Sequence, residues 1–342
     1  MAKSVKLADI AERLGVSTVT VSKALSGKRG VSEDMREKIK VLADEMGYRQ
    51  PSAVRRARPR KSYNIGVLVA SYYLGKYNSF YWQMYQAVAT KALQKECFTI
   101  LEVISEEDEA ACVLPKILQE RKADGIIVIG RPSCEYLEQL QKKADVPIVY
   151  LDFYEEKQKC DAVISDSFYG AYQLTNYLIE MGHRRLAFVG TILSSSSITD
   201  RYLGFTKALL EHNLEVRQDW VIEDRNIEDR RIDIVHKLTI PEDMPTAFVC
   251  NCDLTASELI KKLQEKGYRI PEDVSIVGFD NYLYPGLCDV AITTYEVNIK
   301  EMARKTVHAL LCHMEKESPR LGIDIVEGHM VVKDSVKRLE NV

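Results

Sequence analysis

Residues 7–25 read LADIAERLGVSTVTVSKAL, and this stretch decides the organisation of the N-terminal part of the chain. Apolar residues recur at helical spacing over 7–14, which predicts a first helix. Gly15 follows as a residue that tolerates positive φ and ends this helix. Ser17 is a good cap for a second helix over 18–25. A helix, a glycine turn and a short second helix form the pattern of a helix-turn-helix unit.

The second predicted helix has the side-chain chemistry of a DNA reader. Hydroxyl groups and Lys23 suit phosphate oxygens and base edges, and a methyl-bearing side chain suits the thymine methyl group. The candidate DNA-binding residues here are Ser17, Thr18, Val19, Thr20, Ser22 and Lys23. The alternative interpretation is a β-branched strand, against which Gly15 and the flanking helical patterns argue.

Charge is distributed unevenly along the 342 residues. Residues 1–61 contain 15 Lys and Arg and 7 Asp and Glu, whereas the whole chain contains 47 and 50. A third helix is expected after Ser32, ending at Gly47, and a basic segment with two prolines follows it. Within this segment a short helix is expected to form only on DNA, because so few residues are marginal as an isolated helix. Its candidate DNA contacts are Ser52, Ala53, Arg55, Arg56 and Arg58.

From residue 63 onward, strand and helix patterns alternate, which predicts parallel sheets covered by helices on both faces. Strands are expected at 65–70, 98–103, 125–129, 147–151, 162–164, 186–189, 247–250 and 274–277. These units are too many for one small sheet, so we expect two subdomains. Ligands of such sheets bind at the carboxyl ends of the strands, where aromatic, hydroxyl, Arg, Asp and Asn residues gather.

The residues at these strand ends suit a neutral polyol, because sugar faces pack on aromatic rings and hydroxyl groups pair with charged side chains. Phe80 or Tyr81 could alternatively belong to the hydrophobic core, and Asp152 could alternatively cap the helix that follows it. The candidate effector-binding residues are Ser71, Phe80, Tyr81, Asp152, Ser195, Arg201, Asn251 and Asp280.

Several motifs agree in one register with the lactose-repressor (LacI) family, which the chain therefore resembles. In the N-terminal head, residues 1–61, these are residues 7–11, 15–17, 20–22, 31–32, 36–38 and 47–48. In the remainder of the chain they are residues 182–185, 201–205, 250–253, 271–275, 277–281 and 292–294. The resemblance implies that Thr18, Val19 and Lys23 face bases in the major groove, while Ser17, Thr20 and Ser22 hold phosphates. It also implies a sensor similar to periplasmic sugar-binding proteins, with Phe80, Tyr81, Arg201, Asn251 and Asp280 lining the effector pocket.

Two departures from the family bear on function. The chain has Arg58 where the family usually has a hinge leucine that kinks DNA; arginine can instead enter a narrow minor groove. Purine-binding members carry a second arginine near Ser195, and its absence here favours a sugar over a purine base.

These patterns predict a helix-turn-helix domain over 1–50, a hinge over 51–62 and a sensor over 63–342. We assign the first subdomain to about 63–163 and 293–322, and the second to about 164–292 and 323–342. No leucine heptad follows residue 335, so a homodimer on double-stranded operator DNA is expected.

The sequence also argues against other classes of protein. It has no long apolar run or secretory leader, which predicts a cytoplasmic protein, and its eight cysteines form no C-x-x-C pair, so we expect no metal or cofactor. An enzyme is disfavoured because G-x-G-x-x-G, P-loop and G-x-S-x-G motifs are missing at the expected places. A sugar-binding protein without a DNA role is a further alternative, against which the missing leader and the basic N-terminal segment count. A purely architectural DNA-binding protein is another, but it would not need a large sensor.

Overall fold

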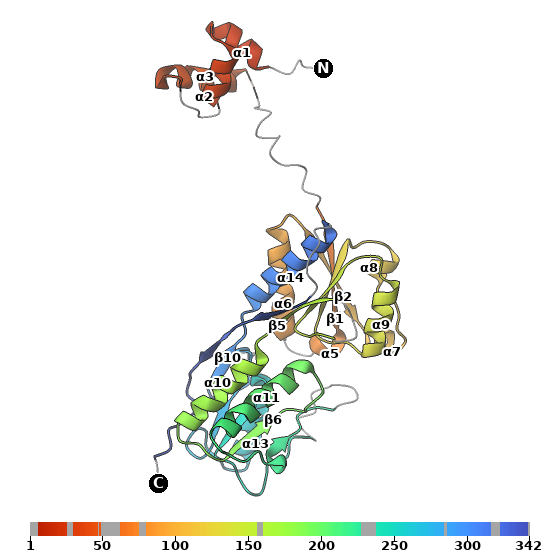
Figure 1. Cartoon of the computed structure of the whole chain (residues 1–342), viewed down its shortest axis with the longest axis vertical. Helices are drawn as coiled ribbons and strands as arrows, with labels where there is room; N and C mark the ends of the chain where they lie inside the picture. Colours follow the sequence, from red (N-terminus) through yellow and green to blue (C-terminus); the bar gives the residue numbers. More distant parts are fainter. Residues whose placement is uncertain are drawn as a thin grey trace. The chain divides into compact units, whose positions relative to one another are not determined.

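The computed structural model describes residues 6–25, 30–46, 48, 62–74, 80–155, 160–226, 237–283, 286–315 and 322–340. The chain divides into two units, Met1–Lys61 and Ser62–Val342 (Figure 1). The hinge candidates Ser52, Ala53, Arg55, Arg56 and Arg58 lie outside the described residues.

The described residues of the first unit form three helices: α1 (Leu7–Leu14), α2 (Thr18–Leu25) and α3 (Glu33–Glu45). Gly15 adopts φ 63°, and the N–H of Val16 donates to the carbonyl of Ala11, which closes the turn. The buried residues of the three helices are Ile10, Ala11, Val21, Ala24, Ile39 and Ala43. The predicted helix-turn-helix is therefore confirmed, and residues 18–25 are helical rather than extended.

The second unit begins with a parallel six-stranded sheet in the order β11-β5-β4-β3-β1-β2. Its strands are β1 (Asn64–Ala70), β2 (Phe98–Ile104), β3 (Gly125–Ile129), β4 (Ile148–Leu151), β5 (Asp161–Ser165) and β11 (Ile323–Val326). Its helices are α5 (Ser71–Leu74), α6 (Phe80–Leu93), α7 (Glu106–Ala110), α8 (Lys116–Gln119), α9 (Cys134–Lys143) and α14 (Ile299–Met314). β1, β3 and β4 are apolar and almost completely buried, as strands covered on both faces must be.

A second parallel sheet has the order β7-β6-β8-β9. Its strands are β6 (Leu186–Val189), β7 (Val221–Ile222), β8 (Ala247–Cys250) and β9 (Ser275–Val277). It carries α10 (Ser167–Glu180), α11 (Ser196–Glu211), the short 3-10 helix Gln218–Trp220 and α13 (Asp253–Glu265). β10 (Thr294–Glu296) and β12 (His329–Val331) pair antiparallel. The prediction of two α/β subdomains is thus confirmed.

The expected boundaries between the subdomains need correction. β11 pairs in parallel with β5, so residues 323–326 belong to the first sheet and not to the second subdomain. Isolated bridges join Thr293 to Val277 and Glu296 to Asp280, which places residues 293–296 beside the second sheet. At both points the chain therefore passes from one subdomain to the other a few residues later than expected. The strand with which such a short segment pairs decides the sheet to which it belongs.

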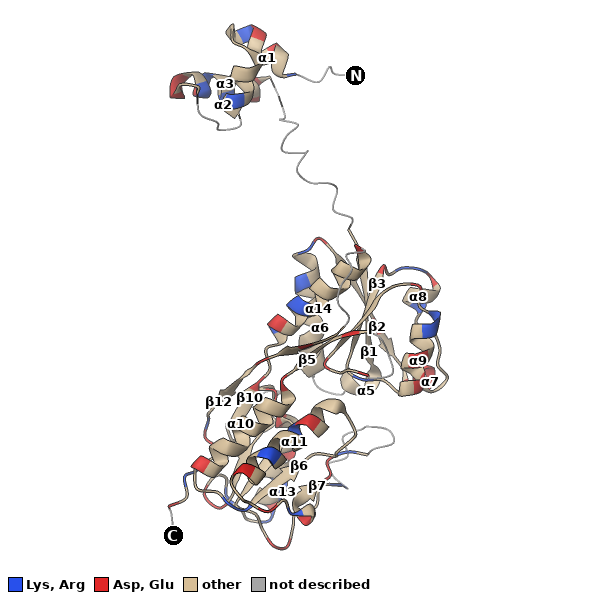
Figure 2. Ribbon diagram, in the orientation of Figure 1, with Lys and Arg blue, Asp and Glu red and all other residues tan. Residues whose placement is uncertain are grey.

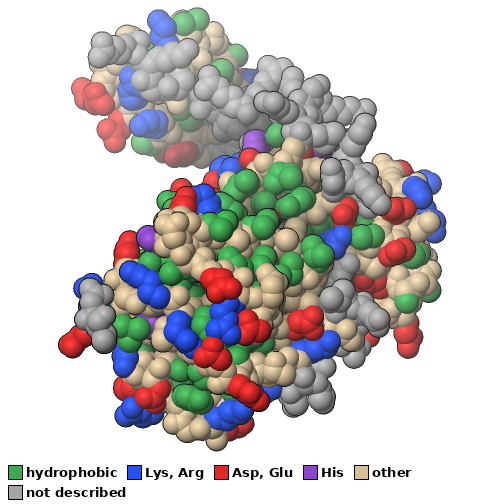
Figure 3. Space-filling view, turned by 60° about the horizontal axis from the view of Figure 1, so that its bottom comes forward, with side chains coloured by type: hydrophobic (Ala, Val, Ile, Leu, Met, Phe, Trp, Pro, Cys, Tyr) green, Lys and Arg blue, Asp and Glu red, His purple; other side chains and the backbone are tan. Residues whose placement is uncertain are grey.

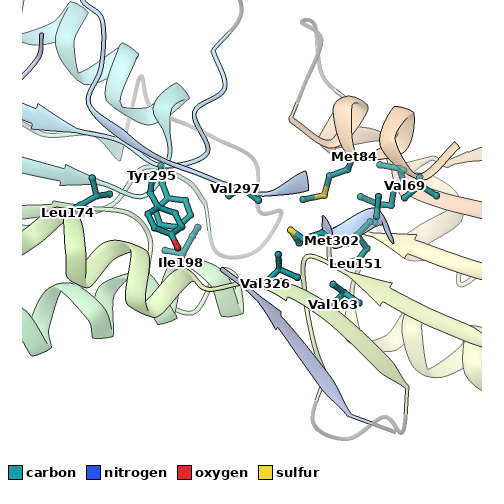
Figure 4. Packing of buried hydrophobic residues seen from close by; sticks show 14 of the residues in the cluster. Val69, Met84, Leu151, Val163, Leu174, Ile198, Tyr295, Val297, Met302 and Val326 are labelled. Atoms are coloured by element: carbon teal, nitrogen blue, oxygen red, sulfur yellow. The ribbon is translucent and has the colours of Figure 1, made fainter. Parts of the chain in front are cut away.

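One hydrophobic core runs through both subdomains (Figure 4). Val69 and Met84 lie at its end in the first subdomain, and Leu174 and Ile198 lie at its end in the second. The crossing segments contribute Val297 and Val326, which lie between these two groups, while Tyr295 lies beside Ile198 and Met302 of α14 lies beside Met84. A movement of one subdomain on the other must therefore be accommodated within a packed core.

Helices α10 and α11 approach closely at Gly204. A Cβ atom at this position would lie 2.1 Å from the carbonyl oxygen of Phe168 and 3.0 Å from the amide nitrogen of Tyr172. We expect Gly204→Ala to lower the free energy of unfolding of the sensor unit by about 1–3 kcal/mol, since backbone must shift to admit the methyl group. Urea unfolding measures this, with the exposed neighbour Leu203→Ala as a control that should change little. Equal effects at both positions would contradict the close-packing argument.

Among the described residues, no helix is long and apolar enough to cross a bilayer. Figure 2 marks the charged residues of each unit, and Figure 3 shows acidic and basic side chains interspersed on the visible face of the sensor. That face offers no uniformly basic field for a polyanion.

Candidate DNA-binding surface and effector cleft

The predicted DNA-facing side of α2 is open to solvent. Ser17, Thr18, Ser22 and Lys23 are exposed, and the side chain of Val19 is 60% exposed although it is apolar. Thr20 is half-buried, and the opposite side of the helix packs into the head core. The structure thus brings the six candidates of this helix onto a short segment that can meet DNA.

Two contacts fix the ends of α2. The hydroxyl oxygen of Ser17 accepts a hydrogen bond from the N–H of Thr20 at 3.1 Å and lies 2.9 Å from the Thr20 hydroxyl, which caps the N-terminus. At the other end, Nη1 of Arg36 on α3 donates to the carbonyl of Ala24 at 3.1 Å. Sequence reasoning did not single out Arg36 for this role; a basic residue on a neighbouring helix gives no signal of which carbonyl it binds.

The first subdomain contributes an aromatic wall and one carboxylate to the effector cleft. Ser71 opens α5 and is half-buried, and Phe80 and Tyr81 open α6. The ring of Tyr81 lies 4.5 Å from the ring of Tyr73 and 5.7 Å from that of Phe80, measured between centroids. Asp152 follows β4 at φ 72°, is 8% exposed and is hydrogen-bonded by the Tyr81 side chain. The helix-capping alternative for Asp152 finds no support in these contacts.

The second subdomain contributes Arg201 and Asp280. Arg201 lies on α11, and its Nη1 donates to the backbone oxygen of Asn251. Its Nη2 lies 3.4 Å from the Asp280 carboxylate, and its guanidinium carbon lies 3.8 Å from the centroid of the Phe279 ring. Asp280 follows β9 in the left-handed region at φ 100°. A buried arginine held by a carboxylate, a carbonyl and an aromatic face is part of a site and not of the apolar core.

The electrostatics of the two walls are coupled. Burial raises the pKa of Asp280 to about 7, opposed by Arg201 and reinforced by the charge of Asp152. Burial likewise raises the pKa of Asp152 to about 6, while Arg201 and the hydrogen bond from Tyr81 lower it. Desolvation therefore outweighs the arginine for both carboxyl groups. Because each carboxyl senses charges from the opposite wall, the two subdomains meet at these residues.

This coupling predicts that the unliganded sensor loses stability as the pH rises. Asp280 has a higher pKa in the folded chain than in the unfolded chain, so its proton favours the folded state, and this contribution disappears as the pH rises toward 7. At about 1.4 kcal/mol per pKa unit, the loss between pH 5 and pH 8 is about 2–3 kcal/mol. Asp280→Asn should remove much of this dependence, which urea unfolding at the two pH values measures. An unchanged pH dependence in the variant would contradict the assignment.

A buried ionic network lies behind the cleft, at the ends of β6, β7 and β8. The carboxylate of Asp224 accepts hydrogen bonds from Nε and Nη2 of Arg225 at 3.0 and 2.8 Å, and from the backbone N–H of Thr191 at 3.0 Å. Asn251 and Thr255 donate to it at 2.7 and 2.8 Å. These donors hold the pKa of Asp224 well below its usual range, against the effect of burial. Neither Asp224 nor Arg225 was among the residues predicted from the sequence.

Two of the predicted residues have supporting positions. The Asn251 side chain is buried and is bonded to Val189, Asp224 and Arg225, so it organises the cleft from behind instead of lining it. Ser195 caps α11 by accepting from the N–H of Ile198 at 3.2 Å. A narrow gap with no room for a water molecule lies beside it, lined by Asp152, Ile164, Ser165, Ser167, Ser196, Ser197 and Asp200.

Arg225 also alters the argument about effector class. The preference for a sugar over a purine base rested on the absence of a second arginine near Ser195. The structure places Arg225 close enough to Asp280 and Tyr81 to influence their pKa values. A second arginine therefore acts on the electrostatics of the cleft, from the end of β7, and the case for a sugar rests on the paired carboxylates and aromatic wall.

The described residues contain no group of three or more His, Cys, Asp or Glu side chains placed to hold a metal ion. The eight cysteines are all free thiols. Nothing in the arrangement points to a resident cofactor.

A helix-turn-helix unit and a two-subdomain α/β sensor in one chain define an allosteric DNA-binding regulator. Residues 6–51 match the family model of bacterial regulatory proteins of the lacI family, and residues 175–336 match the model of a periplasmic binding protein-like domain. The chain belongs to the lacI family of bacterial regulatory proteins. It is a DNA-binding transcriptional regulator and not an enzyme, which confirms the predictions of class.

Relatives match along nearly the whole chain. The HTH-type transcriptional repressor PurR of Vibrio parahaemolyticus is 28% identical over 332 residues, covering 97% of this chain and 98% of the relative. The PurR of Vibrio vulnificus is 29% identical over the same length and coverage.

Solved structures show the same fold. A complex of the transcriptional regulator CelR with cellobiose matches with a TM-score of 0.68 at 23% identity, covering 97% of this chain and 99% of the other. The lac repressor dimer bound to operator and the anti-inducer ONPF matches with a TM-score of 0.65 at 21% identity, covering 98% and 100%.

Proposed function

We propose that this protein is an operator-binding repressor whose DNA affinity is controlled by a small-molecule effector, a mono- or disaccharide, held between the sensor subdomains. The observation that carries the proposal is the meeting of Asp152 and Tyr81 from one subdomain with Arg201 and Asp280 from the other. Such groups recognise hydroxyl-bearing rings: carboxylates accept from hydroxyl groups, the guanidinium donates to their oxygens, and the aromatic wall packs on the ring.

The effector would act by favouring one arrangement of the subdomains. A ligand shifts a conformational equilibrium only when it binds the two states differently, and a ligand that contacts both walls does so. We propose that the chain acts in the cytoplasm as a homodimer, with one α2 per operator half-site. Relative movement of the paired sensors would then change the spacing of the heads, with a coupling of about 1–3 kcal/mol being typical.

The test is fluorescence anisotropy of the purified protein on its own upstream DNA, at two salt concentrations, with and without a panel of sugars and purine bases. Selective, salt-sensitive binding that one sugar shifts is the expected result. A shift by a purine base alone would replace the sugar by the alternative effector class, and the absence of selective DNA binding would contradict the operator proposal for those sites.

Lys23→Ala should weaken operator binding and reduce the salt dependence by about one counterion, because a lysine on this face neutralises a phosphate or contacts a base. Lys95→Ala, an exposed lysine of the sensor unit, is the matched control and should leave both quantities unchanged. If Lys23→Ala leaves the affinity and the salt slope unaltered, α2 is not the DNA-reading helix in the expected orientation.

A further inference from the structure

We propose that the effector carries an anionic oxygen group, a carboxylate or a phosphate, and that Arg225 and Arg201 together receive it. The inference rests on the proposed function, because it concerns the same cleft. It goes beyond that function by assigning a charge to the effector and a specificity role to Arg225, which the sequence did not suggest.

The two guanidinium groups converge on one residue. Nη1 of Arg201 donates to the backbone oxygen of Asn251, and Nη2 of Arg225 donates to the side-chain oxygen of the same residue at 3.0 Å. Arg201 comes from α11 and Arg225 from the segment after β7, so two separate elements bring positive charge to one point. Paired arginines at one point are a typical arrangement for binding an oxyanion.

Each arginine retains a donor that the described residues do not use. Nε of Arg201 is buried without a hydrogen-bond partner, although the residue is only 6% exposed. In Arg225, Nε donates to Asp224 and Nη2 donates to both Asp224 and Asn251, while Nη1 has no hydrogen-bond partner among the described residues. Buried polar groups are nearly always satisfied in proteins, so the unmet Nε–H of Arg201 calls for an acceptor oxygen from a ligand. Nη1 of Arg225 offers a second donor that a ligand can reach, since the Arg225 side chain is partly exposed.

Arg225 is held in place before any ligand arrives. Asp224 binds one edge of its guanidinium through two hydrogen bonds, and the carboxylate is itself fixed by Thr191, Asn251 and Thr255. This leaves the Nη1 side of the group available while the rest is immobile. A donor whose orientation is already fixed loses little entropy on binding, which suits a residue that selects between ligands.

The carboxyl groups of the cleft determine when an anion is tolerated. Asp152, Arg201 and Arg225 act on the pKa of Asp280, whereas Arg201 and Tyr81 act on the pKa of Asp152. Asp280 in turn raises the pKa values of the buried Asp253 and Cys252, and Arg225 and Tyr73 act on the pKa of Tyr81. Because burial raises the pKa values of Asp152 and Asp280 to about 6 and 7, both take up protons below neutrality. Protonation removes their repulsion of an anion and leaves the two arginines opposed by Asp224, so anion binding should be tighter at pH 6 than at pH 8.

The experiment is calorimetry on the full-length protein with D-glucuronate, D-glucose 6-phosphate, inorganic phosphate and D-glucose as probes, at pH 6 and pH 8. We expect at least one anionic sugar to bind in preference to glucose, and Arg225→Gln to weaken that binding about tenfold or more. Arg225→Lys keeps the charge and should recover part of the affinity, which separates charge recognition from a loss of folding. Arg217→Gln, a surface arginine paired with Asp219 and Asp243, is the control.

The outcomes separate this inference from the function on which it rests. Preference for glucuronate over glucose 6-phosphate identifies a carboxylate, and the reverse identifies a phosphate; both support the inference. Glucose binding as tightly as its charged analogues, or an anionic sugar bound equally well by Arg225→Gln, overturns it. A neutral sugar that still shifts operator binding would leave the proposed function standing, whereas the failure of every charged and neutral sugar would remove both.

Discussion

Asp224→Ala should lower the free energy of unfolding of the sensor unit by about 3–5 kcal/mol. Asp224 is completely buried and accepts from four residues, and the substitution would leave the charge of Arg225 without its counterion and the donors of Asn251 and Thr255 without their acceptor. Removing one partner of a buried ion pair destabilises a protein far more than replacing both partners by apolar residues, because the remaining charge stays buried without water or a counterion. Urea unfolding followed by circular dichroism measures the change.

Asp243→Ala is the matched control for this prediction. Asp243 also pairs with arginines, Arg185 and Arg217, but its side chain is 53% exposed, so solvent screens these pairs and its loss should cost far less than the loss of Asp224. The pKa of Asp224 lies well below its usual range, so its stabilisation should persist at mildly acidic pH and disappear only as the pH falls below the ordinary carboxyl range. Similar losses for the two variants would show that the Asp224 network is not the anchor of the cleft.

The head was predictable because each of its local signals agrees with the others. The glycine turn, the serine cap and the apolar spacing all act within a few residues, so their consequences follow from the sequence directly. Gly15 adopts the positive φ for which it was singled out, and Ser17 caps α2. The amino-acid sequence of residues 7–25 therefore contains nearly all of the information that specifies the helix-turn-helix.

The cleft was predictable only in part, because its members meet through tertiary structure. Asp280 follows a recognisable strand end and Arg201 lies on the helix after β6, so the alternation of strands and helices pointed to both. Arg225 follows a strand of only two residues, in a stretch rich in charges that resembles a solvated surface loop. Only the parallel pairing of β7 with β6 brings Asp224 and Arg225 beside Thr191.

The same reason explains the misassigned boundary at 323. β11 is a strand of only four residues, and its burial does not alternate clearly between the two faces, since Ile323 and Ile325 are both half exposed. Its sequence pattern therefore does not specify a pairing partner. The strand joins the first sheet because β5 offers it a free edge. A segment of four residues contains too little information to choose between two edges, and the choice is made by the rest of the fold.

Ile39→Ala should unfold the head while the sensor remains folded. Ile39 is fully buried in a core of six small and medium side chains, and truncation to alanine in such a site costs about 2–4 kcal/mol. So small a unit has only a few kcal/mol of stability to lose, since it buries a modest fraction of its surface. Because Met1–Lys61 forms a separate unit, the loss should remain confined to it. Operator binding should fall sharply, and amide NMR signals of the head should collapse to unfolded positions.

Val41→Ala on the same helix distinguishes this mechanism from a direct effect on DNA contact. Val41 is 53% exposed, so its truncation removes little buried surface and should leave the head folded. Ile39 is buried in α3 and not on the exposed side of α2, so a lost DNA affinity in Ile39→Ala can arise only through the fold. If that variant keeps its head signals and still loses operator binding, unfolding of the head is not the cause of the loss, and if it keeps both, the six-residue core is more tolerant than its size suggests. Unfolding of the sensor together with the head would contradict the independence of the two units.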